Sequence, residues 1–248
     1  MSSQWFETFF TPLALDFWRA AVPSSATNEE VDFLVGNLAV APPSSLLDFP
    51  SGLGRHAIAL ASRGYRVTGI DIAPSAVMAA RREAEAVGLC TARFRVGDMR
   101  QPCPDGPFDG AYCFGNSFTD LSHEDTIGFV RSIFEAVRPG ARWIIDTGMA
   151  AELLLPQLMD ERQLDVGGIT YAVQNSYDAV AGRLIQACTF TRGAERELAR
   201  TNQGVYTVAE LHRLLQSQGW MTLGAFGSLD GKPFALRDRR LLLVAQRP

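Results

Sequence analysis

The sequence is poor in the residues that build metal and disulfide sites. Its 248 residues include only four cysteines and three histidines. The cysteines form no C-x-x-C pair, and no histidine stands at a metal-ligand interval, so neither a zinc site nor a disulfide framework is indicated. We expect four free thiols, no metal and a reducing compartment; the thiols are Cys90, Cys103, Cys113 and Cys188.

Two further features are missing: an excess of positive charge and a long apolar run. The formal net charge is −4, from 23 basic and 27 acidic residues, which does not favour a nucleic-acid backbone as partner. No apolar run approaches the ~18 residues of a membrane span. Glu7 and Asp16 interrupt the aromatic N-terminus, unlike a signal peptide. These observations predict a cytoplasmic protein that binds neither nucleic acid nor membrane.

What the sequence does contain is a regular alternation of strand and helix patterns. Strands alternating with helices form parallel sheets, because parallel neighbours need a crossover connection. The final two strands are expected to pair antiparallel, since Asp230–Pro233 turns the chain between them. The prediction is an α/β fold with a doubly wound, seven-stranded, mostly parallel sheet and a C-terminal antiparallel hairpin. Its strands are expected at 45–49, 65–70, 92–96, 108–114, 141–145, 221–226 and 241–246.

Two segments lie outside this alternation. Aromatic residues near the N-terminus predict helices, one beginning at Thr11-Pro12 and another capped by a Thr27–Glu30 capping box. Between 147 and 206, three segments at 169–177, 183–191 and 195–205 alternate with period two, which predicts an inserted antiparallel β meander. A second capping box, Thr207–Glu210, then opens a helix. The expected domains are an N-terminal helical lid (1–40), a Rossmann-like domain (41–146 and 207–248) and the inserted β cap (147–206).

The most informative stretch is the glycine turn after the first predicted strand. Gly52-x-Gly54-x-x-Ala57, with Asp71 19 residues after Gly52, fits a dinucleotide-binding pattern and favours a nicotinamide oxidoreductase. However, acids also end the first and third strands, at Asp48 and Asp98. A cofactor with an ammonium group, a ribose diol and an adenine would use all three acids, and S-adenosylmethionine has these groups. Each acid alone has a structural alternative as a cap or loop carboxylate.

The order and spacing of these motifs resemble those of class I S-adenosylmethionine-dependent methyltransferases of the small-molecule type. The resemblance is carried by Leu46–Arg55, Gly69–Ser75, Gly97–Met99 and Phe108–Tyr112. It implies that the backbone around Asp48, Pro50, Ser51, Gly52 and Gly54 lines the methionyl part of the cofactor. Pro50 departs from the family's usual glycine, and Ser51 stands where cysteine is common.

The resemblance also assigns the rest of the cofactor site. It implies that Asp71 binds the ribose with Ile72 against adenine, that Asp98 accepts from the adenine amine with Met99 on the ring, and that Phe114 lies beside the reactive methyl. The function implied is direct displacement of the methyl group onto a small-molecule acceptor; a protein that only binds the cofactor is the other alternative.

The acceptor site is less defined in the sequence. Gly115-Asn116-Ser117-Phe118 is similar to a segment of glycine- and sarcosine-type N-methyltransferases, so Asn116 and Phe118 are candidate acceptor contacts, each with a turn or core alternative. No catalytic base is evident, because His56, His123 and His212 are all expected in structural or surface roles. Further candidate acceptor contacts are Trp18 of the lid and Tyr171, Tyr177 and Tyr206 of the meander. We expect a monomer, or a homodimer formed through the meander.

Overall fold

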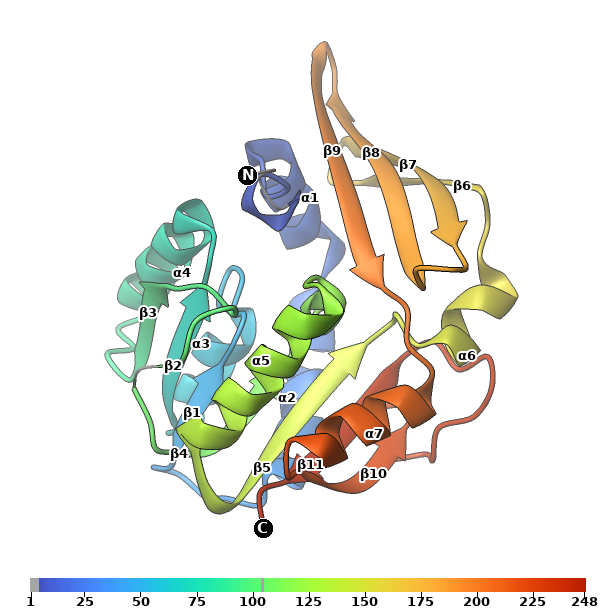
Figure 1. Cartoon of the computed structure of the whole chain (residues 1–248). Helices are drawn as coiled ribbons and strands as arrows, with labels where there is room; N and C mark the ends of the chain where they lie inside the picture. The colour runs from blue at the N-terminus through green and yellow to red at the C-terminus, as the bar shows by residue number, and fades with distance from the viewer. Residues whose placement is uncertain (1–4, 104) are drawn as a thin grey trace.

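A seven-stranded sheet forms the centre of the molecule (Figure 1). The computed structural model describes residues 5–103 and 105–248. The strands lie in the order β10-β11-β5-β4-β1-β2-β3, and all neighbours are parallel except β11, which pairs antiparallel with β5 and β10. This confirms the predicted fold class. The strands are β1 (Ser45–Asp48), β2 (Arg66–Asp71), β3 (Ala92–Val96), β4 (Phe108–Cys113), β5 (Val137–Thr147), β10 (Met221–Phe226) and β11 (Leu241–Gln246).

Helices cover both faces of this sheet because each carries one apolar stripe. One face packs against α2 (Ser24–Leu38), α3 (Arg55–Ser62) and α4 (Pro74–Ala86). The other face packs against α5 (His123–Ala136) and α7 (Val208–Ser217), around the fully buried Trp143. The crossovers bring the carboxyl ends of β1, β2, β3 and β4 to one edge of the sheet, where ligands bind in such folds.

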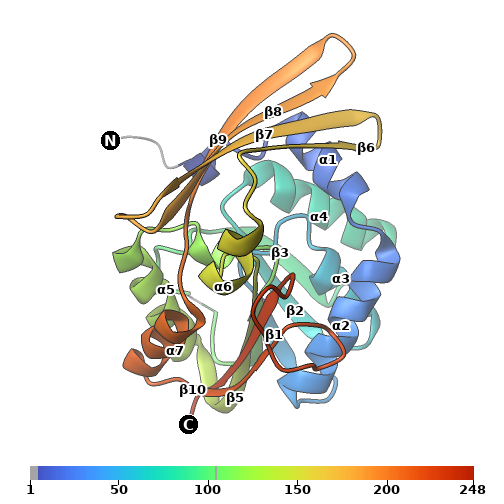
Figure 2. The same cartoon turned by 90° about the vertical axis from the view of Figure 1, so that its right-hand side faces the viewer.

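A second, four-stranded antiparallel sheet lies above that edge (Figure 1). Its strands are β6 (Glu161–Val166), β7 (Ile169–Asp178), β8 (Arg183–Arg192) and β9 (Glu195–Gly204), and we call it the cap sheet. Part of its inner face packs on α1 (Pro12–Ala21), where Phe17 lies against Tyr171 and Phe190. The 3-10 turn η1 (Trp5–Glu7) lies against β9, with the Trp5 indole donating to the Asn202 carbonyl at 3.0 Å. α6 (Ala151–Leu154) and η3 (Leu155–Gln157) join the two sheets (Figure 2).

The structure corrects several details of the sequence prediction. The Thr27–Glu30 capping box is wrong: α2 begins at Ser24 after Pro23, so Thr27 and Glu30 lie inside the helix and face the interior. Thr11 does precede α1, but its side chain makes no cap hydrogen bond. The cap sheet has a fourth strand, β6, which sequence periodicity missed because its exposed edge position leaves it largely polar. The Thr207–Glu210 capping box is confirmed, with both reciprocal bonds present.

The strand boundaries also shift at two places. β5 starts at Val137, ahead of the predicted Pro139-Gly140 break, and the ladder between β4 and β5 changes register there. β10 and β11 pair antiparallel as predicted, but the connection is a long loop over 227–240 instead of a tight turn. Within the described ranges, no helix is long and apolar enough for a membrane span.

Candidate functional site

The turn between β1 and α3 leaves an open space beside its backbone. Gly52 adopts a positive φ of 53°, and a Cβ built there would meet nothing within 4 Å. Gly54 is different: its φ is 77°, and a Cβ would lie 2.6 Å from the Phe94 ring and 2.9 Å from Ala80. Gly54 therefore allows α3 to pack closely, whereas Gly52 leaves room at the strand end for a ligand.

Asp48 lies at the end of β1 and is almost completely buried, at 1% exposure. Burial raises the pKa of its carboxyl well above the usual value; the nearby Tyr112 hydroxyl and the Arg55 charge lower it, and the Asp71 charge raises it further. Among the described residues its Oδ2 atom makes no hydrogen bond of normal geometry, and neither do the buried hydroxyls of Tyr112, the group nearest to forming one, and of Ser51. A buried acceptor without a donor is costly, so this position is suited to a cationic or hydrogen-bond-donating ligand.

Asp71 joins the end of β2 to the glycine turn. One carboxylate oxygen accepts from the Gly52 backbone N–H at 2.7 Å and the other from the Ala73 N–H at 2.9 Å. Burial raises the pKa of this carboxyl, and the two backbone donors partly offset that. Asp71 is not the N-cap of α4, which is Ala73; its carboxylate instead holds the backbone of the two turns, and each oxygen still has a lone pair for a ligand hydroxyl. Ile72 follows it and is half-buried.

Asp98 is held by a neighbour that the sequence analysis did not consider. The Arg100 guanidinium donates to both oxygens of Asp98, reaches Glu7 of η1 at 2.9 Å, and lies over the Phe6 ring at 5.3 Å. Burial raises the pKa of Asp98, but the hydrogen bonds and charge of Arg100 hold it below the usual value overall. A cavity of about 170 Å³ adjoins Asp98; its lining includes Phe49, Ile70, Gly97 and Gln101. Met99 is buried in the core next to this cavity.

The segment after β4 turns sharply under the cap sheet. Phe114 is buried against His56 and Tyr112. Asn116 follows with a left-handed φ of 71°, and its side-chain oxygen accepts from the Gly148 N–H at the end of β5. Phe118 does not face this site: it is fully buried and packs on Phe129 and Trp143 in the core. Phe118 is therefore a core residue, which is the alternative to an acceptor contact that the sequence analysis gave.

The remaining tentative acceptor contacts do not converge on one point. Trp18 is 37% exposed and packs on Tyr171, whose hydroxyl lies 3.3 Å from the Cys188 sulfur. These residues form the contact between α1 and the cap sheet. Tyr206 lies at the other end of the cap sheet, with its hydroxyl 3.4 Å from His123 Nδ1. Tyr177 is half-buried in β7. The sequence analysis did not predict two clusters of buried charged residues near the strand ends.

The first missed cluster is a buried charge network centred on Glu30. Its carboxylate contacts the Arg55 guanidinium, His56 Nε2 at 2.8 Å and the Arg240 guanidinium at 3.1 Å, and Arg240 also pairs with Asp146 at 2.9 Å. Burial alone would raise the pKa of Glu30, but His56 and Arg55 lower it to about 2. Burial lowers the pKa of His56 to about 4, so the ring is neutral. The network joins α2, α3, β5 and the loop before β11 beneath the glycine turn.

The second is Asp120, which follows η2 (Ser117–Thr119). Its side chain is buried at 5% exposure and accepts a 2.8 Å hydrogen bond from Gln203 of β9. Burial raises the pKa of this carboxyl to about 8, although Gln203 and Arg183 act in the opposite direction. The only sequence signal was an acid inside the otherwise uncharged segment after β4.

The comparisons with known proteins agree with this geometry. A family model described as "Methyltransferase domain" matches residues 46–140, from the start of β1 into β5. The chain is 28% identical over 218 residues to the cypemycin N-terminal methyltransferase of a Streptomyces species, covering 82% of this chain and 83% of that protein.

The chain contains a methyltransferase domain.

This methyltransferase is also 35% identical over 108 residues to the demethylmenaquinone methyltransferase of Thermus thermophilus, an alignment that covers 42% of this chain and 46% of that protein. Its fold is similar to that of the CcbJ methyltransferase from Streptomyces caelestis, with a TM-score of 0.84 at 16% identity over 97% of this chain and 98% of the other. The matched domain and the curated relatives favour S-adenosylmethionine as the cofactor, and the nicotinamide and binding-only alternatives are not favoured.

Proposed function

We propose that this methyltransferase transfers the methyl group of S-adenosylmethionine to an amino nitrogen of a small molecule. The observation that supports S-adenosylmethionine binding is the buried, unpartnered Asp48 oxygen beside the open Gly52 turn. Support for an amine as the methyl acceptor comes from relatives: one is named an N-terminal methyltransferase, and structural neighbours are described as an amino pentose methyltransferase and a sugar N-methyltransferase.

The cofactor would lie along the carboxyl ends of β1 to β4. Asp48 and Ser51 are suited to the ammonium end of the cofactor, because Asp48 has an unpaired acceptor oxygen. The Gly52 backbone is suited to the methionyl chain, because there is free space beside it. Asp71 would accept from the ribose hydroxyls. The remaining roles follow the strand order, with Pro50 and Gly54 in the turn, Ile72 and Met99 against adenine, Asp98 toward its amine, and Phe114 near the methyl.

Asp98 would work differently from a free carboxylate. Arg100 already donates to both of its oxygens, so an adenine amine would share the carboxylate with a fixed guanidinium. Through Arg100 and Glu7, the N-terminal segment is tied to this position. We therefore propose η1 and α1 as the lid over the adenine side and the cap, 147–206, as the cover over the acceptor side; α2, which the expected 1–40 lid included, packs on the central sheet instead.

When bound, the cofactor supplies a methyl group activated by a positively charged sulfur. The protein must hold the acceptor nitrogen in line with that methyl at about 3–3.5 Å. It must also keep water away from the reacting atoms, and the cap sheet and α1 cover the strand ends where this would occur (Figure 1). Asn116 and Tyr206 remain proposed acceptor contacts, whereas Trp18, Tyr171 and Phe118 are used in packing.

Two measurements test this function. Calorimetry with S-adenosylhomocysteine and with NADPH should give binding of the first alone. A panel of primary and secondary amines, including amino sugars, should then release S-adenosylhomocysteine in the presence of S-adenosylmethionine, with the matching alcohols as controls. Turnover of alcohols and of no amine would show that the acceptor class is wrong.

A further inference from the structure

The inner face of the cap sheet is apolar at one end and polar at the other. Over α1 it is apolar, with Val173, Tyr171 and Phe190 packed on the helix. Toward the end of β4 it becomes polar, although it remains covered. There, Thr201 donates to the Gln186 oxygen at 3.0 Å and Gln186 donates to the Asn175 oxygen at 2.8 Å. A sheet that served only as a cover would not need buried polar side chains at this end.

This polar strip ends at Asp120. Gln203, two residues from Thr201 on the same face of β9, is 7% exposed and donates to Asp120 Oδ1 at 2.8 Å and to the Asn116 carbonyl at 3.5 Å. The carboxylate thus lies between the cap sheet and the turn that follows β4. That turn is where the acceptor meets the methyl group in the proposed function.

The charged and titratable groups that face Asp120 do not neutralise it. Arg183 of β8 lies near enough to act on its charge, but the guanidinium donates instead to the Leu121 carbonyl at 2.8 Å and to Asn202. Asp71 of β2 adds a like charge, and the buried Cys113 thiol of β4 faces the same region. Within residues 5–103 and 105–248 no ion pair includes Asp120.

A buried carboxylate without a cation destabilises the fold once it is ionised. Such a group is typical of a site that receives a proton or a cationic ligand. We propose that Asp120 is the proton acceptor for the methyl acceptor, which enters as a protonated primary or secondary amine. This proposal rests on the amine acceptor proposed above.

The proposed step is balanced. The bound ammonium pairs with the Asp120 carboxylate and gives it one N–H proton. The freed nitrogen lone pair forms a bond to the methyl carbon while the methyl–sulfur bond breaks, and that electron pair stays on sulfur as a neutral thioether. The product leaves as an N-methylammonium ion, and Asp120 returns its proton to water. The raised pKa of about 8 suits this cycle, because a base works best when its pKa is near the working pH.

The test compares Asp120→Asn with wild type on one amine across pH 6 to 10. The asparagine keeps an oxygen for Gln203 but takes no proton, so only the minor neutral form of the amine reacts. We expect kcat/KM to fall about 100-fold at pH 7.5 and then to rise about tenfold per pH unit up to the pKa of the amine. The affinity for S-adenosylhomocysteine should stay unchanged, and the melting temperature at pH 8.5 should rise by several degrees, because the ionised carboxylate is gone.

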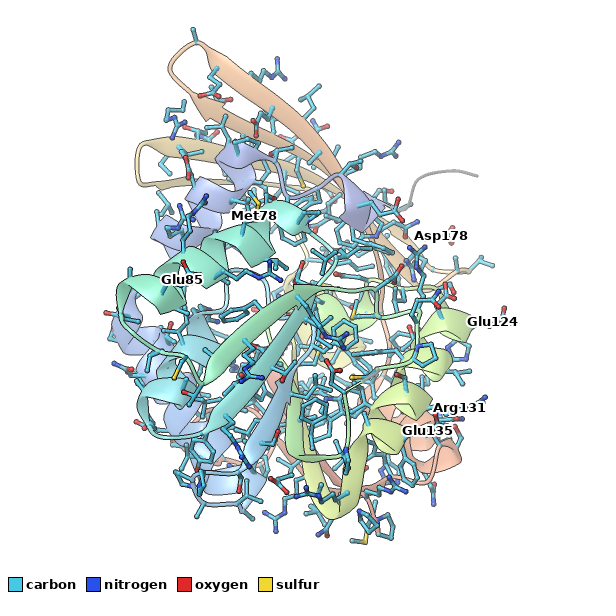
Figure 3. The ribbon with its side chains drawn as sticks, turned by 90° about the vertical axis from the view of Figure 1, so that its left-hand side faces the viewer. Met78, Glu85, Glu124, Arg131, Glu135 and Asp178 are labelled. Carbon is cyan, nitrogen blue, oxygen red and sulfur yellow. The ribbon has the colours of Figure 1, made fainter. Side chains whose placement is uncertain are left out.

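Two further variants separate this role from a structural one. Glu124→Gln removes the same charge from an exposed position on α5 nearby (Figure 3) and should leave rate, pH profile and stability unchanged. Gln203→Leu removes the bond to the cap but keeps the carboxylate; because that bond lowers the pKa of Asp120, the pH profile should keep its wild-type shape and shift to higher pH. An Asp120→Asn variant with the wild-type profile, or a Gln203→Leu variant with the profile expected for Asp120→Asn, overturns the proposal. If the wild type methylates no amine, the amine acceptor itself is wrong and the proton-acceptor role fails with it.

Discussion

Replacing Glu30 by glutamine should destabilise this methyltransferase more than any other single charge removal on α2. The pKa of Glu30 falls from 4.5 to about 2 in the folded state, which corresponds to an upper bound of about 3.5 kcal/mol of stabilisation at about 1.4 kcal/mol per pKa unit. Glu30 is only 9% exposed, so solvent screens little of its interaction with the neighbouring charges. The variant would leave Arg55 and Arg240 partly buried beside a neutral amide, and we expect a loss of about 3 kcal/mol at pH 7.5.

The same network should make the wild type sensitive to acid. The folded pKa of Glu30 lies below its unfolded value, so its stabilisation is present above pH 4.5 and is lost as the pH falls toward about 2. His56 acts in the same direction over a higher range: its folded pKa of about 4 lies below 6.5, so the unfolded state takes up a proton first between pH 6.5 and 4. Stability should therefore begin to fall below pH 6.5.

Urea unfolding followed by fluorescence measures both effects. Glu29→Gln is the matched control, because Glu29 is the preceding residue on α2 and is exposed. It should change the free energy of unfolding by less than about 0.5 kcal/mol. If Glu30→Gln matched Glu29→Gln at pH 7.5, the network would contribute nothing to stability and our account of it would be wrong.

Three other variants test separate parts of the site. Asp71→Ala should weaken S-adenosylhomocysteine binding at least tenfold in calorimetry and should also lower the melting temperature, because the Gly52 and Ala73 N–H groups lose their acceptor; unchanged affinity would misplace the ribose. Gly54→Ala should destabilise the protein by about 3 kcal/mol in urea unfolding, since its Cβ would contact Phe94 and its φ is positive; a neutral result would contradict the packing described for α3. Thr207→Ala should cost about 1 kcal/mol through loss of the α7 cap, and an unchanged stability would show that the capping box contributes little.

Much of the fold was predictable because it depends on local patterns. Alternating strand and helix periods, together with the Gly52–Gly54 turn, indicate a parallel sheet whose carboxyl ends meet. The Thr207–Glu210 capping box was predicted correctly because both of its hydrogen bonds form within four consecutive residues. The identical reasoning failed at Thr27, because Pro23 begins α2 earlier and Glu30 is drawn inward by Arg55, His56 and Arg240.

The parts that failed depend on contacts between distant segments. No residue near Glu30 in the sequence indicates its ion pair with Arg240, because the loop over 227–240 brings Arg240 to it from far along the chain. The sequence around Asp98 does not indicate that Arg100 links it to Glu7. The sequence around Asp120 does not indicate its burial, which depends on the cover provided by β9. Tyr171 was proposed as an acceptor contact as an aromatic residue of the meander, and Phe118 from the resemblance of its segment; in the structure Tyr171 packs against α1 and Phe118 packs in the core.

The most direct test of the proposed activity is the transfer of a labelled methyl group from S-adenosylmethionine to the amine panel, with mass-spectrometric assignment of the methylated atom. The account predicts a product methylated on nitrogen, formed by the wild type and about 100-fold more slowly by Asp120→Asn at pH 7.5. A product methylated on oxygen or carbon, formed equally well by both proteins, would contradict it.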